Sequence, residues 1–323
     1  MIKSDLRIVF MGTPEFAVET LKALVENGYQ VVAVVTQPDK PVGRHQTEMQ
    51  PSAVKQYALS QGLPVLQPEK MKDPEFVEQL RSYQANLQVV VAFRMLPEIV
   101  WAMPEYGTFN VHAALLPQYR GAAPINWAVI NGETQTGVTT FFLDHDIDTG
   151  RIIMKLPFDI PDDADVEYVY DGLMHLGAKI CLETLERIMA ADGHPETIAQ
   201  KDIPLTSLKP APKIFKETCE VDWSKRGKQV YDFVRGLSPY PGAWTTLVTP
   251  DGKETILKIY KTSKTGDDCH AEAGQLKIVG KRLLVATADE WLSVEELQLA
   301  GKKRMAVRDF LNGMKDIESY HLK

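Results

Sequence analysis

The feature that most constrains the fold is an alternation of apolar runs with helical patterns in the first half of the chain. A mostly apolar run at residues 6–11 is followed by a segment whose apolar residues recur at helical spacing as far as Gly28. A second, entirely apolar run then occupies residues 31–35. Strands that are apolar on both faces are typical of a parallel sheet covered by helices, so this segment predicts a strand–helix–strand unit.

The same alternation continues to about residue 190. Residues 165–190 carry apolar residues on one face of a long amphipathic helix with acidic residues at its start, and this helix is expected to close the domain. The pattern favours a doubly wound, Rossmann-like α/β domain with a parallel sheet over residues 1–191. Further strands are expected near residues 63–66, 87–93, 107–111 and 137–143, with helices near 52–61 and 124–133.

The second half of the chain has a different pattern. Residues 192–212 contain four prolines among polar residues and show no sustained periodicity, which predicts a linker. Short strands at regular spacing between two helices indicate a small barrel or sandwich over residues 213–323. The helices are expected near 224–237 and 306–312, and the strands near 243–248, 255–262, 274–279, 282–287 and 290–298.

The composition is that of a globular protein. Hydrophobic residues make up 44% and charged residues 24% of the 323 residues, which excludes intrinsic disorder. The longest apolar stretches fall far short of the ~20 residues of a membrane-spanning helix, and the N-terminal run is too short for a signal peptide. The three cysteines are widely separated and form no CxxC pair, so neither a disulfide framework nor a structural zinc site is expected. We therefore expect a reduced, cytoplasmic protein.

Charge is distributed unevenly along the chain. The formal net charge of −7 argues against nonspecific binding of nucleic acid by the whole molecule. Residues 210–323, however, hold 19 basic and 16 acidic residues, whereas residues 1–209 hold 17 and 27. The C-terminal third is therefore the basic part of the chain.

The motif GTPEF at residues 12–16 forms a strand-to-helix turn. It is not the GxGxxG fingerprint of dinucleotide-binding proteins, and the next strand ends in Thr36 and Gln37 instead of an acidic ribose ligand. A dinucleotide site is therefore not expected. The motif is either a tight turn with Pro14 in the first helical turn or a backbone surface that a substrate approaches.

Two polar motifs follow later strands. Asn110 and His112 stand two residues apart at the end of a predicted strand, so they project to the same side, where ligands bind in an open α/β sheet. The acidic turn DHDIDTG at residues 144–150 is compatible with a metal site, with a solvated turn, or with a carboxylate that orients His112. An EF-hand is excluded because its glycine and terminal glutamate are missing at the required offsets.

Taken together, these motifs resemble the folate-dependent formyltransferase family. In that family an Asn, a His two residues later, an LLP run, an RGAAP run and an Asp in a DTG turn form the active site, and all of them occur here. Several long motifs in one order are far more specific than any single motif. The resemblance covers essentially the whole chain: MGTPEFAV at 11–18, QPDKPVGR at 37–44, GLPVLQPEK at 62–70, NVHAALLPQYRGAAPI at 110–125 and IDTG at 147–150, followed by KIFKE, VDW, VRGLSPYPGAW and LAGKKRM.

The motifs of the second half resemble those family members that formylate the methionine carried by initiator tRNA. The resemblance implies 10-formyltetrahydrofolate as the formyl donor, initiator methionyl-tRNA as the acceptor, and no metal. It implies that Asn110 donates a hydrogen bond to the tetrahedral oxyanion, that His112 is a second donor or a proton shuttle, and that Asp148 orients His112 and receives the proton of the amine. It also implies an OB-like β-barrel over residues 213–323, and a monomer away from membranes is expected.

Further residues are assigned by the same resemblance. Arg44 matches the loop that contacts the acceptor end of the tRNA, and Lys302, Lys303 and Arg304 belong to a mildly basic surface of the OB-like domain. Arg120 is expected to anchor its loop through hydrogen bonds. Leu115 and Leu116 are equally compatible with plain core. The segments that match folate-contacting parts of the family supply Phe93, Arg94, Leu96, Ala114, Leu115, Leu116, Pro117, Asp144 and Asp146.

Three departures from the family pattern are visible. Ala114 precedes the LLP run where Ser is usual, and Gln118 stands where an Arg is usual. The loop after Arg44 reads HQTEMQ where close relatives carry adjacent lysines, and its Glu48 adds a charge of opposite sign. Two alternatives therefore stay open. One is a formyltransferase that acts on glycinamide ribonucleotide or an amino sugar nucleotide, and the other is a noncatalytic folate- or RNA-binding module.

Overall fold

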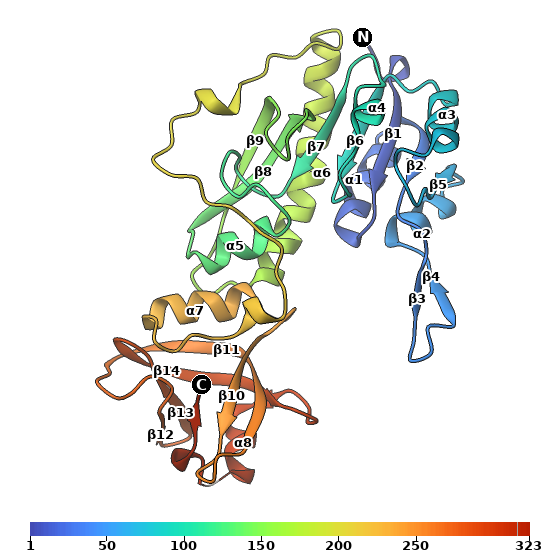
Figure 1. Cartoon of the computed structure of the whole chain (residues 1–323). Helices are drawn as coiled ribbons and strands as arrows, with labels where there is room; N and C mark the ends of the chain where they lie inside the picture. The colour runs from blue at the N-terminus through green and yellow to red at the C-terminus, as the bar shows by residue number, and fades with distance from the viewer. Residues whose placement is uncertain (315) are drawn as a thin grey trace. The chain divides into compact units, whose positions relative to one another are not determined.

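A computed structural model describes residues 1–314 and 316–323 of the chain (Figure 1). By their contacts these residues divide into two compact units, and the division does not follow a single cut along the chain. The segment expected to be a linker belongs to the first unit as far as residue 210, and two short segments of the first half belong to the second unit. The first unit comprises residues 1–121, 135–159 and 170–210, and the second comprises 122–134, 160–169 and 211–323.

A seven-stranded sheet forms the centre of the first unit. From one edge to the other, the strands are β5 (Val65–Leu66), β2 (Gln30–Val35), β1 (Arg7–Gly12), β6 (Leu87–Val91), β7 (Thr108–His112), β8 (Gln135–Phe142) and β9 (Ile152–Asp159). The first five strands run parallel, whereas β8 and β9 continue the sheet antiparallel. Strand β6 is buried along its whole length, as its apolar sequence predicts.

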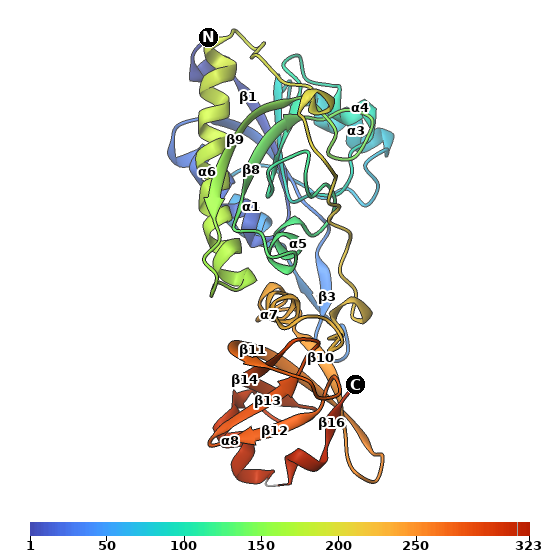
Figure 2. The same ribbon diagram turned by 90° about the vertical axis from the view of Figure 1, so that its left-hand side faces the viewer.

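Helices cover both faces of this sheet (Figures 1 and 2). Helices α3 (Pro74–Ser82) and α4 (Glu98–Trp101) contribute to an apolar cluster with the β1 and β6 residues Val9 and Val90. Helix α6 (Val166–Ala190) lies on the opposite face, with Thr184 hydrogen-bonded to Thr140 of β8 at 2.8 Å. The remaining helices of the first unit are α1 (Glu15–Glu26) and α2 (Ala53–Ser60).

A curled antiparallel sheet forms the second unit. Its strands follow the order β12 (Leu276–Val279), β13 (Arg282–Ala286), β14 (Glu290–Leu299), β11 (Glu254–Asp268), β10 (Ala243–Val248) and β16 (His321–Leu322), and β15 (Met305–Ala306) pairs with β14. The register of β11 against β14 shifts at several points, which lets the long strand bend. Helices α5 (Pro124–Ile130), α7 (Gly227–Gly236) and α8 (Val307–Gly313) complete the unit.

A buried ion pair explains why segments of the first half belong to the second unit. Asp232 and Arg235 of α7 are 4% and 7% exposed, and they pair at 2.8 Å. Arg235 Nη1 also donates to the carbonyl oxygen of Ala164 at 3.0 Å, and Asn126 of α5 donates to the carbonyl of Gly236 at the end of α7. Buried charges persist when they are paired and hydrogen-bonded, and here those bonds fix both segments to α7.

The predicted fold class is confirmed: an α/β unit with a Rossmann-like parallel sheet precedes an OB-like antiparallel half-barrel. The elements that the sequence patterns do not anticipate include α3, α4, β9, the short strands β15 and β16, and a hairpin of β3 (Lys40–Val42) and β4 (Glu48–Gln50). Strand β9 contains Pro157, which is tolerated because β9 lies at the sheet edge. None of the described helices combines the length and the apolar character that crossing a membrane requires.

Candidate active site

Strand β7 places Asn110 and His112 on one face of the sheet at its carboxyl end. Asn110 pairs in register with Val90 of β6, which belongs to the apolar cluster below α3 and α4, and His112 pairs with Thr139 of β8. The spacing of two residues therefore brings both side chains to the same side of the strand. The Oδ1 atom of Asn110 is buried and has no hydrogen-bond partner among the described residues. This oxygen is thus available to a hydrogen-bond donor of a ligand, and the Nδ2 group of the same amide is a donor in its own right.

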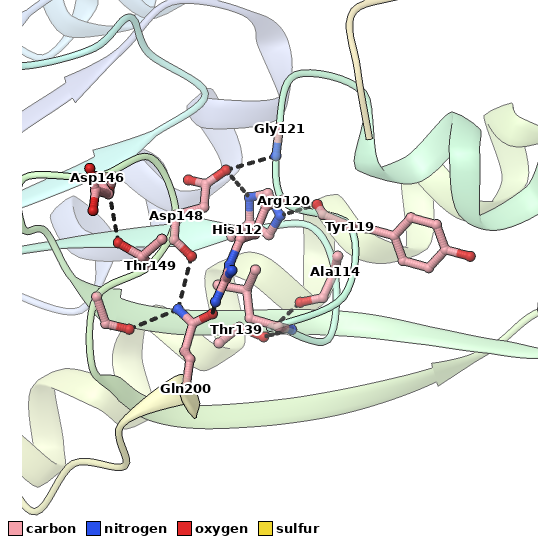
Figure 3. Close-up of polar contacts among 12 residues, drawn as sticks. His112, Ala114, Tyr119, Arg120, Gly121, Thr139, Asp146, Asp148, Thr149 and Gln200 are labelled. Atoms are coloured by element: carbon pink, nitrogen blue, oxygen red, sulfur yellow. Dashed lines mark hydrogen bonds and ion pairs between the residues drawn. The ribbon is translucent and has the colours of Figure 1, made fainter. Parts of the chain in front are cut away.

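The ring of His112 has one partner at each nitrogen (Figure 3). Its Nε2 atom lies 2.9 Å from the carbonyl oxygen of Tyr119. A carbonyl oxygen only accepts hydrogen bonds, so Nε2 carries the hydrogen in this contact. Its Nδ1 atom lies 3.9 Å from Oδ2 of Asp148, and both side chains are largely buried. The carbonyl therefore holds the ring by a hydrogen bond at Nε2, and the carboxylate faces Nδ1 from beyond hydrogen-bonding distance.

The acidic turn brings Asp148, and neither of its two neighbouring aspartates, to His112. Asp148 has a left-handed backbone with φ of 56°, and its Oδ2 atom accepts a hydrogen bond from the backbone N–H of Gly121 at 3.0 Å. Asp144 instead closes the turn, since its Oδ1 accepts from Thr149 Oγ1 at 2.8 Å. Asp144 and Asp146 are exposed. Among the described residues, no group of three or more His, Cys, Asp or Glu side chains is arranged to hold a metal ion.

Gln200 links the acidic turn to the loop after β7. Its Nε2 atom donates to the carbonyl oxygens of Asp148 and Gly150, each at 2.8 Å. Its Oε1 atom accepts from Arg120 Nε at 3.1 Å and Nη2 at 2.8 Å (Figure 3). The prediction that Arg120 anchors its loop through hydrogen bonds is confirmed, with Gln200 as the partner. The side chain of Gln200 is almost completely buried.

The loop predicted to contact folate combines core and site residues. The hydroxyl of Thr139 donates to the carbonyl oxygen of Ala114 at 2.6 Å and accepts from the N–H of Leu116 at 3.1 Å, which fixes the loop to β8. Leu116 is fully buried and packs with Phe141 in the core, so its side chain is structural. Leu115 is half-buried and Pro117 is buried.

The second predicted folate segment follows β6. Arg94 donates to the backbone carbonyls of Pro68 and Glu69, and its guanidinium carbon lies 5.4 Å from the ring centroid of Phe93. Partial burial lowers the pKa of the Arg94 guanidinium from its ordinary value. Leu96 is buried in the cluster below α3 and α4. Arg94 therefore serves to hold the segment, whatever contact it makes with a substrate.

Arg44 lies in the turn of the β3–β4 hairpin and is exposed. The base of the hairpin is fixed by Asp39, which accepts hydrogen bonds from Gln67 at 2.8 Å and from Lys55 at 2.9 Å. These bonds lower the pKa of the Asp39 carboxyl, the bond from Gln67 most. A hairpin with a fixed base can present an exposed arginine to a partner.

The three predicted basic residues of the second unit are not equivalent. Lys302 and Lys303 are exposed. Arg304 forms an ion pair with Glu296, and its guanidinium lies 4.3 Å from the ring centroid of Tyr260. Its charge is therefore partly neutralised within the unit, and the two lysines are the better candidates for contacts with phosphates.

Two site residues are missed by reasoning from the sequence alone. Gln200 lies in a proline-rich segment without periodicity, and Thr139 is one threonine in an apolar strand, so neither residue carries a local signal. Tyr119 contributes its backbone carbonyl, which no side-chain motif can indicate. The contacts of Gln200 and Thr139 join residues far apart in the sequence, and only the folded chain shows them.

A family model described as formyl transferase matches residues 6–185, and a second, described as formyl transferase, C-terminal domain, matches residues 213–315. The chain therefore belongs to the formyl transferase family. Its curated relatives include methionyl-tRNA formyltransferases of Parabacteroides distasonis, 59% identical over 99% of both chains, and of Bacteroides thetaiotaomicron, 55% identical over 100% of both chains.

Two solved structures, one of them of a sugar formyl transferase, share the fold. The sugar 3N-formyl transferase WlaRD superposes with a TM-score of 0.64 at 16% identity, covering 92% of this chain and 99% of its own. HypX from Aquifex aeolicus, solved with tetrahydrofolic acid, gives a TM-score of 0.62 at 18% identity over 96% of this chain and 48% of its own. At these identities the comparison supports the fold alone.

Proposed function

We propose that this protein transfers the formyl group of 10-formyltetrahydrofolate to the α-amine of methionine on initiator methionyl-tRNA. The observation that carries the proposal is the 59% identity to a curated methionyl-tRNA formyltransferase over 99% of both chains, which includes the second unit as well as the first. The arrangement of Asn110, His112 and Asp148 at the carboxyl end of the sheet supports the chemistry. A noncatalytic binding module would have no need of these three side chains together.

In the proposed mechanism, Asn110 stabilises the developing negative charge. Attack of an amine on the formyl carbon produces a tetrahedral oxyanion, and catalysis needs a hydrogen-bond donor directed at that oxygen. The oxyanion then collapses, the bond between the formyl carbon and N10 of the donor breaks, and tetrahydrofolate leaves with a proton on N10 in place of the one that the amine gave up. The amide Nδ2 of Asn110 is that donor. Removing one such donor typically lowers the rate by on the order of 100-fold or more.

We assign removal of the proton from the attacking amine to His112 and Asp148. Because Nε2 is held by the Tyr119 carbonyl, Nδ1 is the ring atom left to act between Asp148 and the substrate. The 3.9 Å separation of Nδ1 and Asp148 Oδ2 is longer than a hydrogen bond, so both atoms retain the capacity for a further partner. We assign to Asp148 the orientation of the ring and the final acceptance of the proton, directly or through water.

The substrates are assigned to separate parts of the chain. We propose that residues 93–96, the half-buried side chain of Leu115 with the backbone of residues 114–117, and the backbone at Asp144 and Asp146 contact the pterin. Aliphatic walls with backbone hydrogen bonds suit a flat, partly apolar ring. Catalysis is assigned to the first unit. The tRNA is assigned to Arg44 and to the basic surface of the second unit with Lys302, Lys303 and, to a smaller extent, Arg304. We propose that the enzyme acts as a monomer in the cytoplasm, without a metal.

The decisive test is a comparison of acceptors with 10-formyltetrahydrofolate as the donor. We expect transfer to initiator methionyl-tRNA and little transfer to elongator methionyl-tRNA, free methionine or an amino sugar nucleotide. Transfer to the sugar nucleotide, or release of formate without any acceptor, would overturn the proposed substrate. The variant His112→Ala, folded by circular dichroism, should lose transfer; full activity in that variant would contradict the proposed site.

A further inference from the structure

Residues 198–209, here named the strap, cross the first unit beside the candidate active site. The strap begins with two backbone hydrogen bonds between Ile198 and Ile152 of β9, at 2.8 and 2.9 Å. It then contacts both segments that surround His112. The strap lies within the segment 192–212 that the sequence pattern predicts to be a linker, and these bonds attach it to the first unit.

At its first contact, Gln200 holds the acidic turn. A single side-chain amide satisfies two carbonyl oxygens of that turn, Asp148 and Gly150, while its oxygen receives two N–H groups of Arg120. Every hydrogen-bonding direction of the Gln200 side chain is therefore directed at the turn or at the loop after β7. Because its donors and its acceptor all have protein partners and the side chain is almost completely buried, Gln200 holds the turn and the loop in one arrangement.

At its second contact, the end of the strap holds the loop after β7. The N–H of Tyr119 donates to the carbonyl oxygen of Lys209 at 2.7 Å. Gln118 donates to the carbonyl oxygen of Ser207 at 2.8 Å and accepts from the N–H of Lys209 at 2.6 Å. Gln118 is one of the positions at which this chain departs from the family pattern, and its amide uses both of its ends on the strap.

The two residues that the strap holds are the two partners of His112, and both have an unfavourable backbone. Asp148 has φ of 56° and Tyr119 has φ of 60°. A non-glycine residue in this left-handed region costs about 1–2 kcal/mol and persists when the surrounding structure fixes it. The bonds from Gln200 and Lys209 supply that fixation on either side of His112.

We propose that the strap positions the two partners of His112, and that Gln200 is a positioning residue for formyl transfer. Gln200 sets the place of the Asp148 carboxylate through the backbone of its turn, while residues 207–209 set the place of the Tyr119 carbonyl. Gln200 touches neither substrate nor reacting atoms in this assignment. The kinetic part of the inference rests on the proposed function, whereas the structural part does not.

The test uses two substitutions of nearly the same size in the full-length chain. Gln200→Met removes the donor and the acceptor without burying a charge, and Gln200→Glu keeps an acceptor for Arg120 but removes the donor to the turn. Misplacing a catalytic group by about 1 Å can cost on the order of 100-fold in rate. We expect kcat to fall by about tenfold or more in both variants, with the KM of both substrates changed by less than about twofold. Gln79→Glu, the same exchange at an exposed position of α3, is the matched control and should behave as wild type.

A second readout needs no activity. The N–H of Gly121 donates to Asp148 Oδ2, so its amide proton resonance reports the position of the carboxylate. We expect this resonance to move upfield in Gln200→Met as the bond lengthens, while the amide of Gly107, which donates to the carbonyl of Pro104, does not move. A general loss of stability would not single out the Gly121 amide.

The measurements distinguish a failure of the strap proposal from a failure of the proposed function. A lowered kcat with unchanged KM and a shifted Gly121 resonance supports the strap. Wild-type kcat in both variants, a decrease that only follows the folded fraction measured by thermal unfolding, or an unmoved Gly121 resonance overturns it. If the wild-type protein fails to formylate methionyl-tRNA, the proposed function fails, and the Gly121 resonance in Gln200→Met still decides the inference.

Discussion

Two amide side chains at the site differ in their hydrogen bonding. Asn110 keeps a buried oxygen without a partner among the described residues, whereas Gln200, of the same chemical type, uses both ends of its amide on protein groups. An amide with free capacity suits a ligand, and an amide fully used suits a structural role.

Asn110→Asp removes the proposed oxyanion donor while keeping the shape of the side chain. We expect kcat for formyl transfer to fall by about 100-fold or more, because a carboxylate cannot donate to an oxyanion and repels it. Steady-state kinetics with both substrates measures the effect. Asn312→Asp, the same exchange at an exposed position of α8, should leave kcat unchanged, and an equal loss in both variants would contradict the role of Asn110.

At the scale of elements, short turns and hairpins place the site residues and their partners. The turn after β8, the loop after β7 and the β3–β4 hairpin each depend on a few bonds at their bases. Such segments are sensitive to backbone changes, in contrast to the long helices around them.

Gly150 ends the acidic turn at a point where no side chain fits. A Cβ atom there would lie 1.6 Å from the carbonyl oxygen of Phe142, so Gly150→Ala must displace the turn that carries Asp148. We expect a loss of stability above about 2 kcal/mol together with a lower kcat, measured by urea unfolding and formyl transfer. Gly313→Ala has no atom within 4 Å of the new methyl group and should change neither quantity.

Arg44 should contribute to the binding of tRNA and not to the binding of folate. We expect Arg44→Ala to raise the KM for initiator methionyl-tRNA several-fold and to leave the KM for 10-formyltetrahydrofolate unchanged, because a phosphate contact contributes to binding and not to folate chemistry. Arg81→Ala, an exposed arginine of α3, serves as the control. Equal changes in both KM values would remove the hairpin from the tRNA interface.

Asp289 makes the stability of α7 dependent on pH. The pKa of its carboxyl is lowered, first by the hydrogen bond from the Gly227 N–H and then by Arg226. A group whose pKa is lowered by folding stabilises the protein above its unfolded value, about 3.9, and this contribution is lost as the pH falls through the folded value. We expect Asp289→Asn to destabilise the second unit at pH 7 and to differ less from wild type below about pH 4. Tryptophan fluorescence during urea unfolding can follow this, and a difference independent of pH would contradict it.

Across the whole molecule, charge is divided between an acidic first part and a basic C-terminal part. Binding of nucleic acid through phosphates releases counterions. The logarithm of the affinity therefore falls linearly with the logarithm of the salt concentration, with a slope proportional to the number of phosphates contacted. We expect the KM for tRNA to rise steeply with KCl, and the slope to decrease in the double variant Lys302→Gln, Lys303→Gln. The KM for the folate donor should be insensitive to both changes. An unchanged slope would exclude these lysines from the interface.

How much the sequence predicts depends on the range of the interaction. Apolar runs predict β1, β2 and β6 because burial on both faces is a local pattern, and the strand period places Asn110 and His112 on one side. No local sequence pattern indicates the hydrogen bonds of Gln200 or the ion pair of Arg304 with Glu296, because these partners come together only when the chain folds. The assignment of α5 to the second unit is equally invisible, because its apolar residues suit either core.

The interleaved division of the chain has a consequence for biosynthesis. Helix α5 leaves the ribosome long before its partner α7 is made, and its Asn126 must wait for the carbonyl of Gly236. The sheet of the first unit, by contrast, contains only residues up to Asp159 and can assemble early. A nascent chain therefore exposes the unpaired face of α5 until the C-terminal third arrives, and premature termination in that interval leaves a product with a completed sheet and an incomplete second unit.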